Sequence, residues 1–387
     1  GILSATMPPR TGFDIGDVRV AGPAVLAALA GYSDLPYRLL CRRMGAPLCH
    51  TEMLLDRMLL QPKVRRRLVP TDPADRPLAA QLIGNDPATM AAAAGVLAER
   101  GADVIDLNFA CPVRKALRRR RGGWLLNDPD RALAIVRAVV AASDRPVTLK
   151  LRRAFHETDR SAGGFWRIAE GALAAGAAGL CVHARSVEAK YAGPADWGFL
   201  AQVRRRLSEA TLIGSGDVHA PADVARMREA TGADGVAVAR GALGNPWFFR
   251  QVADVSAGRP VRPPDLAEQR RVLAGHFEAA CALYGPNRGA RHMRKFGIRY
   301  ARLHPHPRAV REAFVAVRRP ADWQAVLQQH YTDDAVASTR DTQYVQPVGA
   351  PHAETNASPH TNASCTAGGP VRRGRPVRDG PAADGGG

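Results

Sequence analysis

The sequence contains few cysteines and no long apolar run. Its six cysteines are scattered over 387 residues without a Cys-x-x-Cys pair, which excludes a disulfide scaffold or a zinc ribbon and gives no indication of a metal site. No apolar stretch reaches the roughly 20 residues that cross a bilayer. The stretch 18–31 is broken by Gly22 and Pro23, so we interpret it as a buried strand rather than a targeting segment. We therefore expect a reduced, cytoplasmic protein without a membrane anchor or a bound metal.

Acidic residues are scarce relative to basic ones. There are 36 Asp and Glu against 54 Lys and Arg, which gives a formal net charge of +18 and a pI near 10.6. Such an excess favours an acidic partner, with nucleic acid first. Only five of the basic residues are Lys, however, and a GC-rich genome that inflates Arg, Ala, Gly and Pro is the alternative explanation.

Eight short apolar runs alternate with longer helical patterns. Each run carries apolar residues on both faces, as a covered parallel strand requires, and Asp34, Asp86 and Asp128 mark helix starts just ahead of a Pro. Eight βα units in about 225 residues predict a (β/α)8 barrel. The competing doubly wound sheet would carry a GxGxxG turn after its first strand, which is absent. The runs are 25–30, 48–53, 77–82, 103–108, 146–151, 179–184, 211–216 and 235–240. Glycines expected to end helices are Gly45, Gly101, Gly176 and Gly232.

The pattern changes after Val255. Four stretches of helical periodicity predict a small all-helical domain, and a polar segment rich in Gly, Pro, Ser and Thr that follows it predicts disorder. The expected fold is an α/β TIM barrel followed by a helical domain and a disordered tail. The helical stretches are 266–283, 288–303, 307–317 and 321–330. The boundaries are 1–19 for an N-terminal lead-in, 20–255 for the barrel, 256–264 for a linker, 265–331 for the helical domain and 332–387 for the tail.

Polar residues stand at the carboxyl ends of most predicted strands, where barrel active sites form. The turns at 215–217 and 239–241 follow the last two strands, where such barrels often bind phosphate, and Lys150 can reach a ring carbonyl or an anionic ring. Flavin mononucleotide (FMN), a phosphorylated planar cofactor, fits this set. The alternative is a Schiff-base lysine, as in barrel aldolases, which explains neither the cysteine loop nor the basic residues described next. The residues at the strand ends are Glu52, Gln81, Asn108, Lys150, Arg152, His183, Arg185, Ser215, Gly216, Asp217, Ala239, Arg240 and Gly241.

Cys111 differs from the other cysteines because it lies in a loop. The nearby cations of Arg114 and Lys115 are expected to lower the pKa of its thiol and to make it a competent proton carrier. Six of the eight residues 114–121 are basic, so we expect this run to rim the mouth of the site and to contact phosphates, with an ordinary solvated surface as the alternative. A second basic cluster, expected to contact RNA, lies largely on one helix: Arg288, Arg291, His292, Arg294, Lys295, Arg299 and Arg302.

Taken in order, these motifs resemble those of the tRNA-dihydrouridine synthases, and by detail they are most similar to the bacterial general branch. The resemblance runs from about Val20 to His330. Its most specific part is the Asn-x-x-Cys-Pro-x-x-Lys segment. The matching segments are AALAGYSDLPYR (27–38), TEM (51–53), DLNFACPVRK (106–115), TLKLR (148–152), VHAR (182–185), SGDV (215–218) and ARGALGNPW (239–247).

The resemblance implies an FMN-dependent oxidoreductase that uses NADPH to reduce specific uridines of tRNA to 5,6-dihydrouridine. In this family hydride passes from the flavin to C6 of the uracil, and a cysteine, here Cys111, donates a proton to C5 after the base has left the stack. The implied FMN contacts are Ala28, Leu29, Ala30, Gln81, Lys150, Ser215, Gly216, Asp217, Ala239 and Arg240. The residues implied to line the substrate site are Asn108, Lys115, His183 and Arg185. The expected RNA contacts are Arg114, Arg118, Arg119, Arg120, Arg121, Arg291, Arg294 and Lys295. We expect a monomer.

Several positions depart from the family pattern. Ser215 replaces an Asn, which removes an amide near the flavin, and Ala110 replaces the Gly before the cysteine, which would alter the loop if a positive φ were needed there. Ala28, Leu29 and Ala239 also differ, but the family uses backbone contacts there. Two other functions stay open: an FMN-dependent barrel oxidoreductase for a small pyrimidine or enoate, and an RNA-binding homologue with impaired catalysis.

Overall fold

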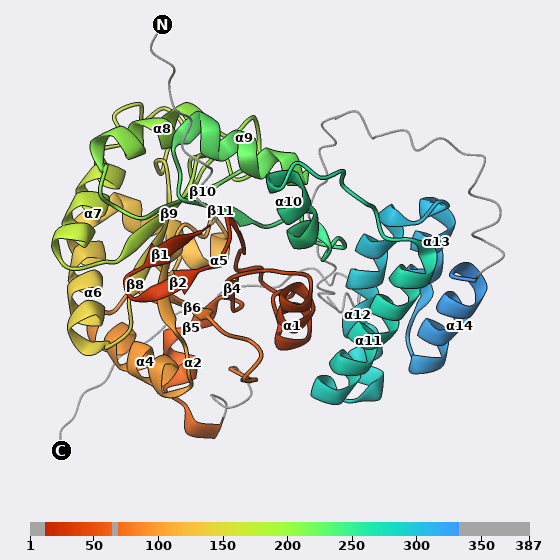
Figure 1. Cartoon of the computed structure of the whole chain (residues 1–387). Helices are drawn as coiled ribbons and strands as arrows, with labels where there is room; N and C mark the ends of the chain where they lie inside the picture. Colours follow the sequence, from red (N-terminus) through yellow and green to blue (C-terminus); the bar gives the residue numbers. More distant parts are fainter. Residues whose placement is uncertain (1–11, 64–68, 333–387) are drawn as a thin grey trace, which may run out of the picture. The chain divides into compact units, whose positions relative to one another are not determined.

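The computed structural model describes residues 12–63 and 69–332, and in it nine parallel strands form one closed barrel with helices outside (Figure 1). The sheet closes because β3 (Ala24–Leu26) pairs with both β11 (Gly235–Val238) and β4 (Cys49–His50). β4 and β5 (Leu54–Leu55) both pair with β6 (Leu78–Ile83), so together they occupy one of the eight positions. The predicted (β/α)8 barrel is confirmed, and closure of the sheet excludes the doubly wound alternative.

The other barrel strands alternate with helices in chain order. The strands are β7 (Val104–Phe109), β8 (Val147–Arg152), β9 (Gly179–His183) and β10 (Leu212–Ser215). The helices are α1 (Leu35–Arg43), α2 (Asp56–Leu59), α4 (Pro87–Glu99), α5 (Arg114–Leu117), the 3-10 helix η1 (Gly122–Asn127), α6 (Pro129–Ala142), α7 (Gly163–Ala174), α8 (Trp197–Arg206), α9 (Pro221–Thr231) and α10 (Phe248–Ser256).

Alternation along β7 shows which side chains face the barrel interior. Ile105 and Phe109 pack in the core between the sheet and the helices, whereas Val104 belongs to a separate apolar cluster inside the barrel. Because successive side chains of a strand point to opposite faces, Asp106 and Asn108 face the interior, progressively nearer to the carboxyl end. Apolar residues therefore fill one end of the barrel, and polar residues fill the end where the active site is expected.

A short hairpin covers the apolar end of the barrel. β1 (Phe13–Ile15) pairs antiparallel with β2 (Val18–Val20), and Phe13 packs in the cluster inside the barrel. The Phe13 ring lies so near Gly235 that a Cβ there would come within 2.3 Å of it. The expectation of one buried strand over 18–31 was wrong. Val18–Val20 forms the second strand of this hairpin, and a separate strand, β3, begins at Ala24.

The helix boundaries follow the local signals in the sequence. Asp34, Asp86 and Asp128 each accept a hydrogen bond from the backbone N–H three residues on, as an N-cap does. The expected helix-ending glycines all have positive φ: Gly45, Gly101, Gly176 and Gly232.

Within the described residues, four helices and a 3-10 turn follow the barrel. They are α11 (Leu266–Tyr284), α12 (Pro286–Tyr300), η2 (Ala301–Leu303), α13 (Pro307–Ala316) and α14 (Pro320–His330), close to the predicted ranges. Tyr37 of α1 packs against His276 of α11 and Phe296 of α12, with ring centroids 5.5 and 5.1 Å apart. The described residues of barrel and helical region belong to one compact unit, so separate domains stay a prediction. Most of the lead-in, residues 1–11, and the tail from 333 lie outside the described residues.

Candidate active site

The loop that carries Cys111 is held by its backbone. Asn108 Oδ1 accepts hydrogen bonds from the backbone N–H groups of Ala110 (3.1 Å) and Cys111 (2.9 Å). Arg152 Nε donates to the Ala110 carbonyl at 3.1 Å. The backbone of Gly122 passes so close that a Cβ there would lie 2.8 Å from the Cys111 Cβ. These contacts fix the thiol directly after the carboxyl end of β7.

The alanine before the cysteine is compatible with this loop. Ala110 is not among the residues with positive φ, so the backbone there does not require glycine. Its N–H and its carbonyl are both used in the anchoring contacts. The loop around Cys111 therefore does not require glycine at position 110.

Burial raises the pKa of the Cys111 thiol above its ordinary value. A hydrogen bond with the Val113 backbone and the charge of Arg152 oppose this shift without cancelling it. The expectation that Arg114 and Lys115 lower the thiol pKa was wrong, because both side chains are exposed on α5 and the cation that acts on the thiol is Arg152. A thiol with a raised pKa stays protonated, which suits a proton donor better than a nucleophile.

His183 stands at the end of β9 and is neutral. Burial and the surrounding cations, led by Arg152, lower the pKa of its imidazole to about 2. Its Nδ1 accepts the backbone N–H of Arg185 at 3.3 Å, so the single proton of the neutral ring sits on Nε2. His183 can therefore donate one neutral hydrogen bond into the site, but it does not supply charge.

Lys150 is half-buried on β8, in register with Asn108 on β7. Its Nζ lies 3.2 Å from the Cys181 sulfur. In the described part of the chain no ion pair joins it to a carboxylate. A cation without an anionic partner at the mouth of a barrel suits an electron-rich ligand.

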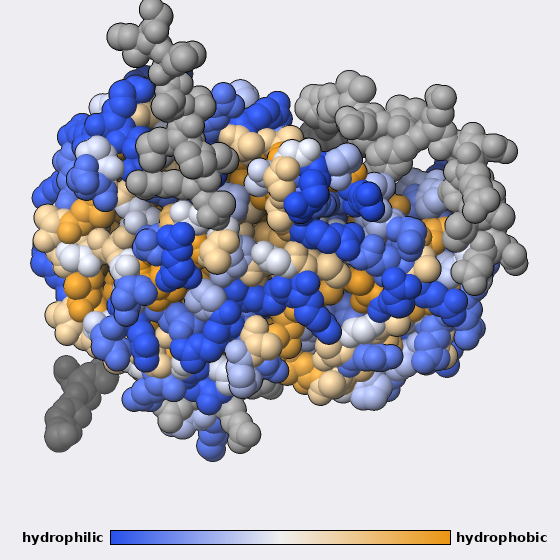
Figure 2. All heavy atoms as spheres, in the orientation of Figure 1, coloured by the Kyte–Doolittle hydropathy of each residue, from blue (hydrophilic) through white to orange (hydrophobic). Residues whose placement is uncertain are grey.

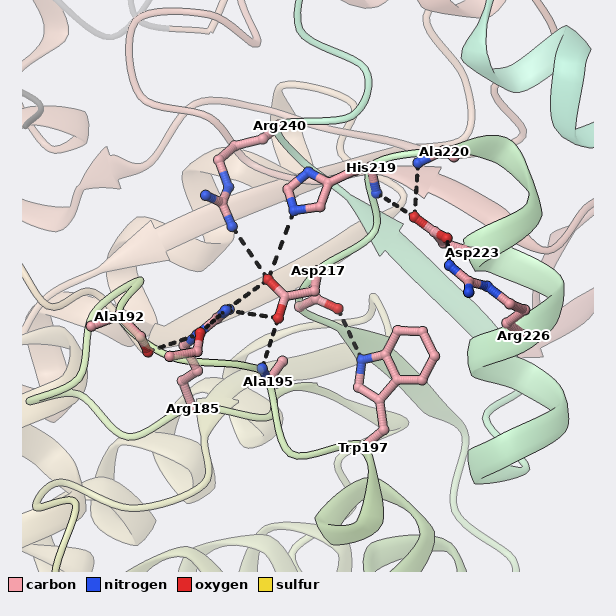
Figure 3. Close-up of polar contacts among 12 residues, drawn as sticks. Arg185, Ala192, Ala195, Trp197, Asp217, His219, Ala220, Asp223, Arg226 and Arg240 are labelled. Carbon is pink, nitrogen blue, oxygen red and sulfur yellow. Dashed lines mark hydrogen bonds and ion pairs between the residues drawn. The ribbon is translucent and has the colours of Figure 1, made fainter. Parts of the chain in front are cut away.

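The loop after β10 is held around Asp217 (Figure 3). Both carboxylate oxygens of Asp217 accept from Arg185 at 2.7 Å, and one also accepts from the Ala195 N–H at 2.7 Å. Arg240 and His219 lie 3.5 and 3.8 Å from the same carboxylate. Burial alone would raise the pKa of Asp217, but the Arg185 and Ala195 hydrogen bonds outweigh it and lower the pKa.

This arrangement bears on two expectations. Arg185 is 4% exposed and also bonds the carbonyls of Ala192 and Gly193, so its guanidinium braces the loops after β9 and β10, and its expected place in the substrate site stays a prediction. The Asp217 side chain is occupied by Arg185, which leaves only its backbone for a cofactor. Gly216 has φ +122°, and a Cβ on it would meet Ala195 at 2.7 Å, so glycine is required there.

The loop after β3 holds the remaining expected cofactor contacts. Leu29 donates its N–H to Ser33 Oγ at 2.9 Å, and its carbonyl accepts from the N–H groups of Tyr32 and Ser33. Ala28 is half-buried and Ala30 is exposed. The Leu29 backbone is thus used within the loop, while Ala28 and Ala30 lie beside the mouth.

The basic run after Cys111 forms an exposed rim with one exception. Arg114, Lys115, Arg118 and Arg119 line a surface hollow of about 490 Å³, and Arg120 lies over the Trp124 ring at 5.3 Å. Arg121 departs from the expectation: its side chain is 9% exposed and lies 4.0 Å from the buried Asp56 carboxylate.

The basic residues of α12 divide between two faces. Arg291 is exposed and Arg294 is half-buried. Lys295 departs from its expected RNA contact, because its Nζ donates to the Gly31 carbonyl and lies 4.9 Å from the Tyr32 ring centroid. His292 bonds the buried Asp34 carboxylate at 2.7 Å. Spacing along the helix did not reveal which of these residues pack on α1 and the β3 loop.

Four site residues were not assigned a role from the sequence. Asp106 and Thr148 lie in register beside Gln81 inside the barrel, and Arg152 anchors the cysteine loop. The spacing of two between Asp106 and Asn108 was an available signal, since it places both on one face. Tyr191 is 54% exposed and lies between Arg152 and Arg240, 5.7 and 5.2 Å from their guanidinium carbons. No short-range pattern indicates this aromatic platform.

The fold and these contacts define a (β/α)8-barrel enzyme with a protonated thiol held at its mouth. A family model described as dihydrouridine synthase (Dus) matches residues 25–336. The chain is 35% identical to tRNA-dihydrouridine synthase B of Xanthomonas axonopodis pv. citri, over 89% of this chain and 99% of that protein. It is 36% identical to a probable tRNA-dihydrouridine synthase of Mycobacterium tuberculosis, over 80% of this chain and 82% of that protein. The chain belongs to the dihydrouridine synthase family.

The similarity to solved structures supports the fold and carries no conclusion about function. Morphinone reductase matches with a TM-score of 0.50 and 17% identity, over 68% of this chain and 94% of that one. Family membership implies a flavin cofactor and a nicotinamide-type reductant. Within residues 12–63 and 69–332, no His, Cys, Asp or Glu side chains group in a way that could hold a metal ion. No helix of that part is long and apolar enough to cross a membrane.

Proposed function

We propose that this protein is a tRNA-dihydrouridine synthase that binds FMN and uses NADPH to reduce uridine in tRNA. The observation that carries the proposal is the anchored, protonated Cys111 at the mouth of a barrel whose relatives are tRNA-dihydrouridine synthases. We propose that it acts as a monomer. We place its action in the cytoplasm, where tRNA substrates are available.

The chemistry of the donor set fits FMN. The unpaired cation of Lys150 and the amide of Gln81 suit the polar edge of a flavin ring. The β10 and β11 loops offer Ser215, the Gly216 backbone and the half-exposed Arg240 to a phosphate. The remaining expected holders are Ala28, Leu29, Ala30, Asp217 through its backbone, and Ala239.

Each residue of the site then has a role in the reaction. When bound, FMN supplies the hydride for C6 of the uracil, and NADPH restores it. Cys111 donates the proton to C5, which its raised pKa permits because the thiol stays protonated at neutral pH. The neutral Nε2–H of His183 and the free amide hydrogen of Asn108 orient the base, which must leave its stack to enter.

The proposed RNA surface consists of exposed cations beside the site. Arg114, Lys115, Arg118 and Arg119 line a hollow on the segment that follows Cys111 in the sequence, and Arg291 is exposed on α12. Figure 2 shows one face of the molecule, on which hydrophilic side chains are interspersed with separate groups of apolar side chains; the proposed RNA surface is defined by the exposed cations named above. Phosphates are the ligands that such a surface recognises.

Flavin reoxidation tests this proposal. The FMN-loaded protein is reduced with NADPH without oxygen and mixed with unmodified tRNA, and flavin absorbance is followed. Rapid reoxidation by tRNA supports the proposal. Reoxidation by a small enoate but not by tRNA would favour the small-molecule reductase, and a protein that binds tRNA but not FMN would favour the impaired homologue.

A further inference from the structure

We propose that Asp106 and Thr148 are positioning residues that orient Cys111 through a directional chain of hydrogen bonds across three strands. The inference rests on the proposed role of Cys111 as the proton donor, but the chain itself is a property of the fold. None of its inner members needs to touch the substrate.

The chain begins in a row of three residues inside the barrel. Gln81 on β6 is in register with Asp106 on β7, and Asp106 is in register with Thr148 on β8. Thr148 Oγ1 donates to Asp106 Oδ1 at 2.8 Å, and Gln81 Nε2 donates to Asp106 Oδ2 at 2.7 Å. The Asp106 side chain is 1% exposed, so these bonds form away from water.

The chain of hydrogen bonds then runs towards the carboxyl end of the barrel, where Cys111 lies. Asn108 Nδ2 donates to Gln81 Oε1 at 2.7 Å, and Asn108 Oδ1 accepts from the N–H groups of Ala110 and Cys111. From the loop to Asp106 every link therefore donates in the same direction, and Thr148 donates to Asp106 from the other side. The final link is the backbone that carries the thiol.

Two fixed ends determine the direction of this chain. Asp106 accepts at both of its carboxyl oxygens, so Gln81 turns its NH2 group to Asp106 and its oxygen to Asn108. A backbone N–H can only donate, so Asn108 must turn its oxygen to Ala110 and Cys111. Both amide orientations follow from donor and acceptor chemistry, and the two ends require the same polarity. A reversal at either end would set like groups against each other in a buried site, which is costly.

A swap of the two β7 side chains tests the chain. In Asn108→Asp, Gln81 lies between two carboxylates and the new one at position 108 lacks a hydrogen to donate, so we expect the loop to loosen. In Asp106→Asn alone, Thr148 can accept from the new amide, so the direction survives. In the double variant Asp106→Asn/Asn108→Asp, Gln81 can reverse, accept from position 106 and donate to position 108, and an oxygen still faces the loop.

The readout is deuterium exchange of the Ala110 and Cys111 amides in the FMN-loaded protein without RNA or reductant. We expect Asn108→Asp to accelerate exchange about tenfold, the scale of one lost buried hydrogen bond, and the double variant to restore most of the protection. The same cycle in a Gln81→Met background should show no rescue, because the link is gone while both charges remain.

If the double variant restores amide protection only when Gln81 is present, the proposed chain of hydrogen bonds is supported. Absence of rescue, or rescue that persists with Gln81→Met and so reflects plain charge repulsion, overturns it. If Asn108→Asp does not fold and the double variant does, recovery of folding is compared in the Gln81→Met background, where the proposal predicts no recovery. Because exchange is measured without turnover, this outcome is independent of the proposed function, which the loss of dihydrouridine formation in Cys111→Ala tests separately.

Discussion

At the scale of single residues, the site separates the group that transfers a proton from the groups that hold it in place. Cys111 is oriented by its backbone, through Asn108, Arg152 and the close approach of Gly122. Its thiol is therefore free of a fixed side-chain base. The imidazole of His183 at the end of β9 is neutral and cannot take over as an acid at physiological pH.

Removal of the thiol should affect only the half-reaction with RNA. We expect Cys111→Ala to lower the rate of dihydrouridine formation by about 10²–10⁴-fold, the usual contribution of a positioned acid, while FMN binding and reduction by NADPH are unchanged. Rapid-mixing absorbance measurements separate the two half-reactions. Cys281→Ala, on the half-buried thiol of α11, is the matched control, and near-normal RNA-dependent reoxidation in Cys111→Ala would remove the thiol from the mechanism.

The pH dependence of turnover follows from the thiol. A proton donor must be protonated, and burial holds the pKa of Cys111 above its ordinary value of 9.0. We expect kcat to stay level through neutral pH and to fall only above about pH 9. Cys111→Ser, whose hydroxyl does not titrate there, should lose this alkaline decline. A decline centred near pH 7 that persists in Cys111→Ser would assign the titration to another group.

At the scale of elements, the short helix α5 connects the loop that carries Cys111 to the arginine run 118–121. The residues after it, Arg118, Arg119 and Arg120, are exposed, whereas Arg121 is turned inward towards Asp56. The same four-residue run thus contains three cations available to phosphate and one that belongs to the fold.

The three exposed arginines should contribute to the salt dependence of RNA binding. Each phosphate contact with a single strand contributes about 0.7 to the slope of log affinity against log salt, so changing all three to Ser should flatten the slope by about 2. Filter binding or fluorescence anisotropy over a range of salt measures it. The matched control changes Arg167, Arg205 and Arg206 on α7 and α8 to Ser, which removes the same charge. Equal flattening of the salt slope in both variants would show that the three rim arginines act only through the overall positive charge and not through specific phosphate contacts.

The elements that the sequence predicted are those specified locally. Asp34, Asp86 and Asp128 cap their helices with their own side chains, and the strand ends follow from apolar runs that stop at a polar residue. The hairpin β1–β2 escaped prediction because strands of three residues carry no recognisable period. The inward turn of Arg121 and Lys295 also escaped, because the partners Asp56 and Gly31 are far away in the sequence.

At the scale of the whole molecule, the helical region and the barrel share a buried aromatic contact. His276 of α11 is 1% exposed, and its Nδ1 pairs with the Tyr300 hydroxyl at 2.9 Å. Burial lowers the pKa of His276 from 6.5 to about 4. The neutral imidazole is therefore part of what joins α1, α11 and α12.

This histidine should make the protein sensitive to acid. Below pH 6.5 the unfolded chain binds a proton at His276, whereas the folded protein binds it only near pH 4. The free energy of unfolding therefore falls as the pH drops from 6.5 to about 4, and this group lowers it no further at more acidic pH. Relative to His276→Gln, we expect the free energy of unfolding to fall by about 3 kcal/mol between pH 7 and 4. Urea unfolding at several pH values measures it, with the exposed His306→Gln as control. Parallel curves for native protein and His276→Gln would contradict the assignment.

The most direct test of the central claim is a nucleoside analysis of the product. The purified protein is incubated with FMN, NADPH and unmodified tRNA, the RNA is digested, and mass spectrometry follows the conversion of uridine to a nucleoside with two more hydrogens. We expect dihydrouridine at one or a few positions with the native protein and a strongly reduced amount with Cys111→Ala. A protein that carries reduced FMN and binds tRNA, yet leaves every uridine unchanged, would contradict the account.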